Sequence, residues 1–155
     1  MNKTKKILFV GNYEKSVGGI SGQIEILREC LLKEEITAEI FTTKRCILVR
    51  FFLIFLLVFK ASRYHILHIH GCSYVGGFFP IVIGTISGKL LKKKTIVTYH
   101  GGEAAIFFKK YPGFIKYFFS LADEITVQSG FLEDVFANYG IKVNVIPNIL
   151  NFEYA

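Results

Sequence analysis

The chain has 155 residues, of which 52% are hydrophobic and 20% charged, so the composition predicts one folded domain and excludes a disordered chain. Nineteen basic and 12 acidic residues give a net charge of +7, which suits a nucleic acid, an anionic membrane or a phosphorylated small molecule without choosing among them. The three cysteines, Cys30, Cys46 and Cys72, are an odd number without close pairing, which favours reduced thiols in a cytosolic protein over a disulfide framework or a metal site.

The first part of the chain predicts a strand, a glycine turn, a helix and a second strand. Lys6–Val10 is a compact apolar strand, and a loop then leads to Gly18-Gly19. Apolar residues recur at helical spacing from Ile20 to Leu31, so a helix begins directly after the glycines with Ser21 as its cap. Ala38–Thr42 is the second strand, and this order of elements predicts a parallel βαβ unit.

Ile47–Phe59 is the most hydrophobic segment of the chain. Spanning a bilayer takes about 20 apolar residues, whereas this segment is shorter and is interrupted by Arg50. We therefore favour a buried or half-buried crossover helix. The alternative is a helix that lies in a membrane surface, because basic residues flank the segment on both sides: Lys44, Arg45, Lys60 and Arg63.

A histidine-rich strand, His65–His70, follows and ends at Gly71. Side chains alternate along a strand, so His68 and His70 share one face and His65 lies on the other, which argues against a metal site made of all three. A metal pair formed by His68 and His70 stays open. We favour His68 in the core and His70 at the strand end, near a cleft.

The next helix and strand lead to the most polar turn of the chain. A helix is predicted from about Phe78 to Leu91, with Pro80 in its first turn and a lysine run as its solvated end. Thr95–Tyr99 is a β-branched, apolar strand of the kind that is covered on both faces. It stops at His100-Gly101-Gly102-Glu103, where a histidine, two glycines and a carboxylate precede a helix.

Ala104–Leu121 mixes aromatic residues with lysines, and Pro112-Gly113 divides it into two short helices or a helix and a lid. Alternating aromatic and basic residues occur in segments that bind single-stranded nucleic acid, in segments that bind anionic lipid, and in core helices whose lysines face solvent. We favour a core helix with solvent-exposed lysines. The remaining elements are a strand at Glu124–Gln128, a helix at Phe131–Tyr139 capped by Ser129, and a strand at Val143–Ile146.

Strands that alternate with helices over short links predict an α/β fold with a Rossmann-like, doubly wound parallel sheet. In the common order 3-2-1-4-5-6 the first and fourth strands are neighbours, so Gly18-Gly19 and the turn at His100 face each other across one crevice. Bare backbone N–H groups at two helix starts favour a phosphate or another anion there. The chain has neither a Gly-x-Gly-x-x-Gly after its first strand nor a Gly-x-x-x-x-Gly-Lys-Ser/Thr loop, which disfavours hydride transfer and P-loop chemistry.

Five short motifs, in order along the chain, resemble the N-terminal domain of family 4 glycosyltransferases, which have the GT-B fold. The resemblance runs from about Lys6 to Asn148, nearly the whole chain. The motifs are Gly18-Gly19 before an amphipathic helix, His68-Ile69-His70-Gly71, Thr98-Tyr99-His100-Gly101, Ala122 to Ser129, and Val145-Ile146-Pro147-Asn148.

This resemblance implies retaining transfer of a sugar from a nucleotide-sugar donor to an acceptor hydroxyl, with no metal and no cofactor besides the donor substrate. It makes His100 the catalytic candidate, which contacts the transferred sugar and supports the departing charge. The other candidates are expected to bind substrate, with Gly18 and Gly19 acting through their amides and Asn148 at the entrance to an interdomain linker: Gly18, Gly19, His70, Gly71, Gly101, Gly102, Glu103 and Asn148.

The resemblance also sets the expected organisation of the protein. Residues 1–148 are expected to form the acceptor-side domain, and residues 149–155 the start of a linker to a C-terminal domain of comparable size. That domain carries most of the nucleotide contacts and a Glu-x7-Glu motif, and it is not in this chain. We therefore expect the fragment to be inactive alone.

The expected partners are a nucleotide-sugar, a glycan or lipid-linked acceptor and an anionic membrane surface, with no nucleic acid. The expected location is the cytoplasm, peripheral on the inner face of the cell membrane, in the assembly of cell-envelope polysaccharide. The rival hypothesis is a peripheral membrane-binding α/β module without catalysis of its own.

Overall fold

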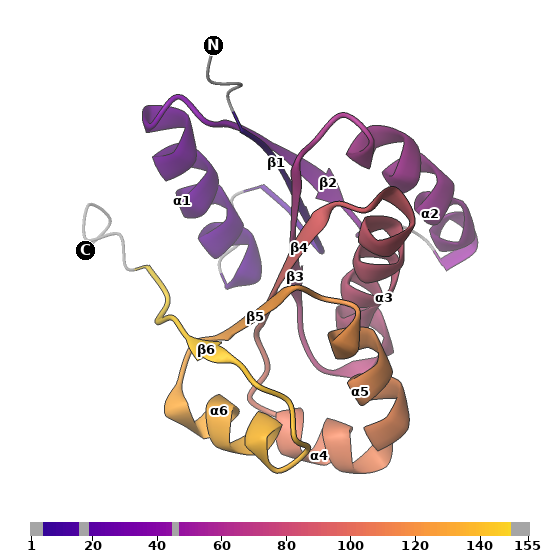
Figure 1. Cartoon of the computed structure of the whole chain (residues 1–155), viewed down its shortest axis with the longest axis vertical. Coiled ribbons are helices and arrows are strands. Elements are labelled where there is room, and N and C mark those ends of the chain that lie inside the picture. The colour runs from indigo at the N-terminus through magenta and orange to yellow at the C-terminus, as the bar shows by residue number, and fades with distance from the viewer. Residues whose placement is uncertain (1–4, 16–18, 45–46, 150–155) are drawn as a thin grey trace.

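The computed structural model describes residues 5–15, 19–44 and 47–149, which form a six-stranded parallel sheet flanked by helices (Figure 1). The strands are β1 (Lys6–Gly11), β2 (Thr37–Thr42), β3 (Ile66–Gly71), β4 (Lys94–Tyr99), β5 (Glu124–Val127) and β6 (Asn144–Val145). The helices are α1 (Ile20–Lys33), α2 (Ile47–Ala61), α3 (Tyr74–Leu91), α4 (Ala104–Lys110), α5 (Pro112–Ser120) and α6 (Gly130–Ala137). The predicted α/β, Rossmann-like fold is confirmed.

The strands lie in the order β2-β1-β3-β4-β5-β6, which differs from the predicted order. β3 lies between β1 and β4, so the prediction that the first and fourth strands are neighbours is wrong. Burial explains the difference, because Leu67 and Ile69 of β3 are fully buried, whereas β2 carries the exposed Glu39 and is partly exposed along its length. The more apolar strand takes an interior position and β2 takes the edge. The reversal of strand order, where α/β proteins bind ligands, therefore falls between β1 and β3.

Two hydrophobic clusters hold helices to opposite faces of the sheet (Figure 1). The larger lies between β1, β3, β4 and β5 and the helices α2 to α6, and Phe78, Tyr99 and Phe108 are among its fully buried side chains. The smaller packs Ile24 of α1 against Phe9 and Ala38. On the face that α1 covers, the far strands β4 to β6 remain accessible to a ligand.

The first helix begins differently from the prediction. α1 starts with Gly19 as its cap, and Ser21 lies inside its first turn, so the prediction of Ser21 as the cap is wrong. The hydroxyl of Ser21 instead accepts a hydrogen bond from the backbone N–H of Glu14 at 3.1 Å. The Ser21 side chain therefore connects the loop after β1 to the start of α1 by a hydrogen bond.

The helix α3 also begins earlier than predicted, at Tyr74, so that Pro80 lies inside it rather than in its first turn. A proline has no N–H to donate to the carbonyl of the residue four positions before it, which is Gly76. That carbonyl accepts a hydrogen bond from Nδ2 of Asn12 at 2.9 Å. Because of Pro80, the Gly76 carbonyl is available to Asn12, and this hydrogen bond connects the loop after β1 to α3.

The apolar helices differ in how much they bury. α3 is long and apolar enough to cross a membrane by length and composition, but it packs in the core through side chains such as Phe78 and Ile81. The aromatic and lysine-rich segment folds as α4 and α5, with Phe108 and Phe119 in the core and its lysines exposed, which confirms the core interpretation. Among the α2 residues whose side chains the structure describes, Leu53, Leu57 and Ala61 are buried and the phenylalanines of the opposite side are exposed, so the helix is half-buried, as one of the two predicted alternatives has it.

Candidate functional site

The turn after β4 is fixed by a buried tyrosine and by the end of β3. Tyr99 is fully buried, and its Oη lies 2.7 Å from Oγ of Ser73. A Cβ atom on Gly101 would lie 2.8 Å from Ser73 Oγ and 2.9 Å from Tyr99 Oη, so the chain passes too close to this pair for a larger residue. The backbone N–H of His100 donates to the carbonyl of Gly71 at 2.8 Å. These contacts hold His100 at the carboxyl edge of the sheet.

A row of polar side chains crosses the sheet beneath this turn. Nδ1 of His70 lies 3.0 Å from Nε2 of His100, and their rings are stacked. Nε2 of His68 lies 2.8 Å from Oγ1 of Thr98, and that hydroxyl lies 2.8 Å from the hydroxyl of Thr126. His68 and His70 share a face, as strand alternation predicted. The row spans β3, β4 and β5 on the face that α1 partly covers.

The three histidines of this row are neutral at neutral pH. Burial lowers the pKa of His68 and of His100 to about 4, and it lowers the pKa of His70 well below its usual value. One ring of the His70–His100 pair therefore donates an N–H to the other. His70 is only 1% exposed, and its Nε2 has no partner among the described residues. His70 contacts His100 and also borders the hollow beside it.

The loop after β1 enters the site at Gly19. This residue has a φ of 67°, a left-handed conformation that favours glycine, and its carbonyl accepts the backbone N–H of Gln23 at 3.1 Å. A Cβ atom here would meet nothing within 4 Å, so the backbone faces open space. Gly18, the other candidate of this turn, lies outside the described residues.

The two predicted turns border one pocket of about 450 Å³, although their strands are not neighbours. Gly19, His100, Gly101 and Gly102 line it from the two sides, and Asn148 lines it from the segment after β6. Oε1 and Nε2 of Gln23 on α1 hold that segment through hydrogen bonds to the backbone of Ile149, at 3.0 and 2.9 Å. The two turns therefore meet across this pocket although β3 lies between their strands.

A second hollow of about 350 Å³ adjoins the first along the open face of the sheet. The histidine and threonine row forms its polar side, and Leu27, Ile96 and Ile146 form its apolar side. Gln23, His100 and Asn148 line both hollows. His100 therefore stands at the boundary between a polar pocket and a mostly apolar one.

The remaining candidates lie outside the pocket wall. Gly71 is buried, and a Cβ atom there would lie 2.6 Å from Cγ1 of Ile81, so glycine allows α3 to approach β3. Its carbonyl holds the backbone of His100. Glu103 precedes α4 and is exposed, and it is not among the residues that line the pocket.

Gln128 is a pocket residue that the sequence did not single out. It follows β5 and lines the pocket, and its Nε2 is buried without a partner among the described residues. A buried amide nitrogen without a partner is costly, so a ligand oxygen here would restore a lost hydrogen bond. The neighbouring Ser129 caps α6, as predicted, by accepting the backbone N–H of Leu132 at 3.5 Å. The carboxyl end of a strand beside β4 was the signal that could have found Gln128.

The pocket is polar but uncharged. Of the described residues that line it, none carries a charge, and its polar side chains are those of Gln23, His100, Gln128, Ser129 and Asn148. Such groups suit the hydroxyls of a sugar, whereas a diphosphate is usually met by cationic side chains. The predicted preference for an anion therefore depends on backbone N–H groups at the start of α1. Among the described residues, no group of three or more His, Cys, Asp or Glu side chains could hold a metal ion.

Fold and pocket together define a Rossmann-like domain with a candidate ligand site at the carboxyl edge of a parallel sheet. Residues 19–154 match the model of the family described as Glycosyltransferase Family 4, and the chain therefore belongs to this family.

The fold is similar to that of the crystal structure of Anabaena Alr3699/HepE in complex with UDP, with a TM-score of 0.56 and 14% sequence identity. The match covers 96% of this chain and 45% of the Anabaena chain, so this chain spans less than half of that protein. A comparison with curated proteins finds no match. These findings confirm the predicted family and its GT-B type of N-terminal domain.

Proposed function

We propose that this chain is the acceptor-side half of a retaining glycosyltransferase, which transfers a sugar from a nucleotide-sugar to a polysaccharide or lipid-linked acceptor. The observation that carries this proposal is the uncharged pocket where Gly19, the turn at His100 and Asn148 meet in a chain of glycosyltransferase family 4. Its size is within the range of small-molecule sites in proteins, which is roughly 300 to 1,000 Å³.

In this proposal His100 contacts the transferred sugar. Its Nε2 is engaged by His70, and among the described residues no group hydrogen bonds to its Nδ1, which leaves that nitrogen for a ligand. A neutral imidazole in a partly buried wall gives a directional hydrogen bond, and it stabilises charge that develops as the donor bond breaks. Gly19, Gly101 and Gly102 allow the sugar to approach the backbone closely.

The first donor class to test is a uridine diphosphate sugar, because the similar Anabaena structure is a complex with UDP. The uncharged wall offers no cationic side chain to a diphosphate, so we assign those contacts to a second domain with the Glu-x7-Glu motif. The proposal includes no cofactor besides the donor substrate. This chain alone then binds sugar weakly and transfers none.

We further place the reaction in the cytoplasm, at the inner face of the cell membrane, where cell-envelope polysaccharide would be assembled. The supporting observation is the exposed apolar side of α2. The same observation favours a second candidate, a peripheral membrane-binding α/β module without catalysis. The two candidates differ in whether the pocket at His100 binds a sugar.

The proposal is tested by pairing the chain with the C-terminal domain of a family 4 enzyme and following transfer of a labelled sugar. His100→Ala should lower kcat by about 100-fold or more, the scale seen when one stabilising hydrogen bond is removed from a transition state. His65→Ala, at the opposite end of the same histidine-rich strand, is the matched control and should keep its turnover. Equal turnover of His100→Ala and the unaltered chain would remove His100 from the reaction.

A further inference from the structure

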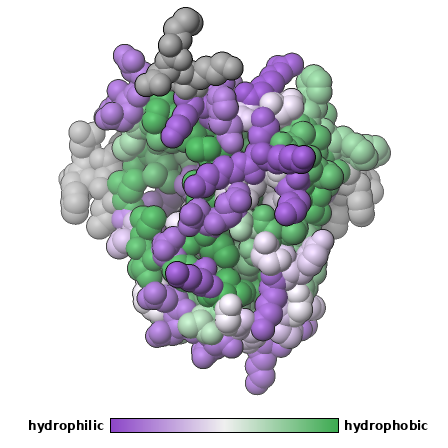
Figure 2. All heavy atoms as spheres, viewed as in Figure 1, coloured by the Kyte–Doolittle hydropathy of each residue, from purple (hydrophilic) through white to green (hydrophobic). Residues whose placement is uncertain are grey.

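One side of α2 is hydrophobic and faces away from the core. Phe52, Phe55, Leu56 and Phe59 are 66%, 72%, 56% and 68% exposed. Their spacing of three and four residues places them on one stripe of the helix, which we call the α2 stripe. A surface helix normally carries polar residues there. Hydrophobic side chains reach the outline of the molecule in Figure 2 on the side where Figure 1 shows α2.

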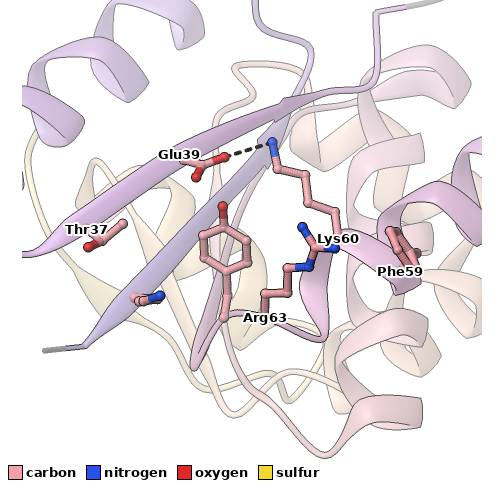
Figure 3. A pocket seen from close by; sticks show the side chains of 7 residues that line it. Thr37, Glu39, Phe59, Lys60 and Arg63 are labelled. Atoms are coloured by element: carbon pink, nitrogen blue, oxygen red, sulfur yellow. Dashed lines mark ion pairs between the residues drawn. The ribbon is translucent and has the colours of Figure 1, made fainter. Parts of the chain in front are cut away.

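A positively charged pocket of about 420 Å³ lies at the end of this stripe (Figure 3). Lys6, Lys60 and Arg63 line it together with one carboxylate, that of Glu39. The guanidinium carbon of Arg63 lies 5.1 Å from the centre of the Phe59 ring, so a cation stands directly beside the last residue of the stripe. Apolar surface and positive charge are therefore continuous.

The single carboxylate of this pocket is already engaged. Oε2 of Glu39 lies 3.1 Å from Nζ of Lys60, a pair that bridges α2 and β2 in Figure 3. Hydrogen bonds from Tyr64 and Lys60 lower the pKa of Glu39, so its charge is balanced within the protein. Among the described residues no carboxylate pairs with Lys6 or Arg63. Two positive charges thus face the pocket for an external anion.

We propose that the α2 stripe and this pocket form a docking surface for a bilayer that contains anionic phospholipid. The phenylalanines and the leucine enter the boundary of the acyl chains, and Lys6 and Arg63 bind headgroup phosphates beside it. The charge of the chain favours this occupant, because α2 itself carries Arg50 and Lys60 without an acidic residue and the whole chain is at +7. A second copy of the chain would bring the same positive charge against it.

The docking surface begins at the same edge of the sheet as the candidate site. The first turns of α2 lie at the carboxyl edge of the sheet, where Arg50 borders a hollow with Asn12, Ser21 and Gly76. Docking along the length of α2 therefore brings the loop after β1 toward the headgroups, whereas the candidate pocket opens on the other face of the sheet, which α1 partly covers. This inference deepens the location proposed for the transferase, and its test involves no sugar transfer.

The test is co-sedimentation of the whole chain with vesicles of phosphatidylcholine, with or without phosphatidylglycerol. Binding should require phosphatidylglycerol and weaken as salt is added. Phe52→Ser with Phe55→Ser should lower the partition coefficient at least about tenfold, since each exposed ring loses its transfer to the lipid boundary. Ile106→Ser, which removes an exposed apolar residue from α4, is the matched control and should bind normally.

The charged part of the surface has its own variants. Arg63→Gln and Lys6→Gln should each weaken binding roughly fivefold, the worth of one basic residue near an anionic surface. Lys116→Gln removes the same charge from exposed α5 and should have a smaller effect. Far-ultraviolet circular dichroism checks that each variant is folded.

Three results would overturn the proposal. The first is equal binding to neutral and anionic vesicles. The second is equal loss in the stripe variant and in its Ile106→Ser control. The third is a dimer in light scattering that the stripe variant dissociates while the unaltered chain ignores vesicles, because this would assign the α2 stripe to a second copy.

Discussion

The buried histidines make the stability of the fold sensitive to mild acid. Burial lowers the pKa of His68 and His100 from 6.5 to about 4, and lowers that of His70 well below 6.5. Between these pKa values the histidines are protonated in the unfolded chain and neutral in the folded chain, so protonation favours unfolding. The stability that depends on these three groups is fully present above about pH 6.5 and is lost as the pH falls toward their folded pKa values.

The size of this loss follows from the shifts. At about pH 5.5, a histidine whose pKa falls from 6.5 to about 4 on folding lowers the free energy of unfolding by about 1–2 kcal/mol relative to neutral pH. His68 and His100 together lower it by about 3 kcal/mol, and His70 changes it in the same direction. This is an appreciable part of the roughly 5–15 kcal/mol that stabilises an ordinary domain. Urea unfolding, followed by circular dichroism at about pH 7.5 and about pH 5.5, measures the difference.

Variants assign the loss to the histidine row. His68→Gln removes one titrating group, so the fall between the two pH values should shrink by about 1–2 kcal/mol whatever the variant does to absolute stability. His65→Gln keeps the three buried histidines and should keep the fall they cause. A free energy of unfolding that is the same at both pH values, or an undiminished fall in His68→Gln, would refute the reasoning.

Three glycines give matched predictions, all read as free energies of unfolding in urea. Gly101→Ala should lower the free energy of unfolding by about 1–3 kcal/mol, because its Cβ would lie 2.8 Å from Ser73 Oγ and 2.9 Å from Tyr99 Oη. At Gly102 a Cβ atom would meet nothing within 4 Å, so Gly102→Ala should change the free energy of unfolding by no more than about 0.5 kcal/mol. Gly19→Ala should cost about 1 kcal/mol although its Cβ would meet open space, because its φ of 67° strains any residue with a side chain. Equal costs at Gly101 and Gly102 would contradict the close packing of the turn.

The sequence predicted the elements well because their signals are local. The spacing of hydrophobic residues defines each helix or strand from within, and the glycine turns and Pro112-Gly113 mark where elements begin or end. Each helix and strand was therefore predicted within a few residues of its observed bounds. The beginning of α3 was missed because a proline normally marks a first turn, whereas Pro80 lies inside the helix and Asn12 satisfies the carbonyl that it frees. That compensation comes from a residue far away in the sequence.

The strand order and part of the site depended on contacts between distant segments. Whether β3 takes an edge of the sheet or lies between β1 and β4 depends on the apolar surface that it buries in the folded chain, and no single motif encodes this. The pocket still joins Gly19 to His100, although β3 lies between their strands. Gln128 was missed because a glutamine at a strand end is unremarkable until its buried amide is seen to have no partner among the described residues.

The central claim is that the pocket between the turn at Gly19 and the turn at His100 binds the sugar of the substrate. The most direct measurement is a nitrogen–proton NMR titration of the whole chain with uridine diphosphate sugars and acceptor glycans. We expect saturable shifts at the backbone amides of Gly19, Gly101 and Gly102 and at the side-chain amide of Gln128. These shifts should be weaker in His100→Ala and unchanged in His65→Ala. Saturable shifts confined to other parts of the chain, or equal binding by the His100→Ala variant, would contradict it.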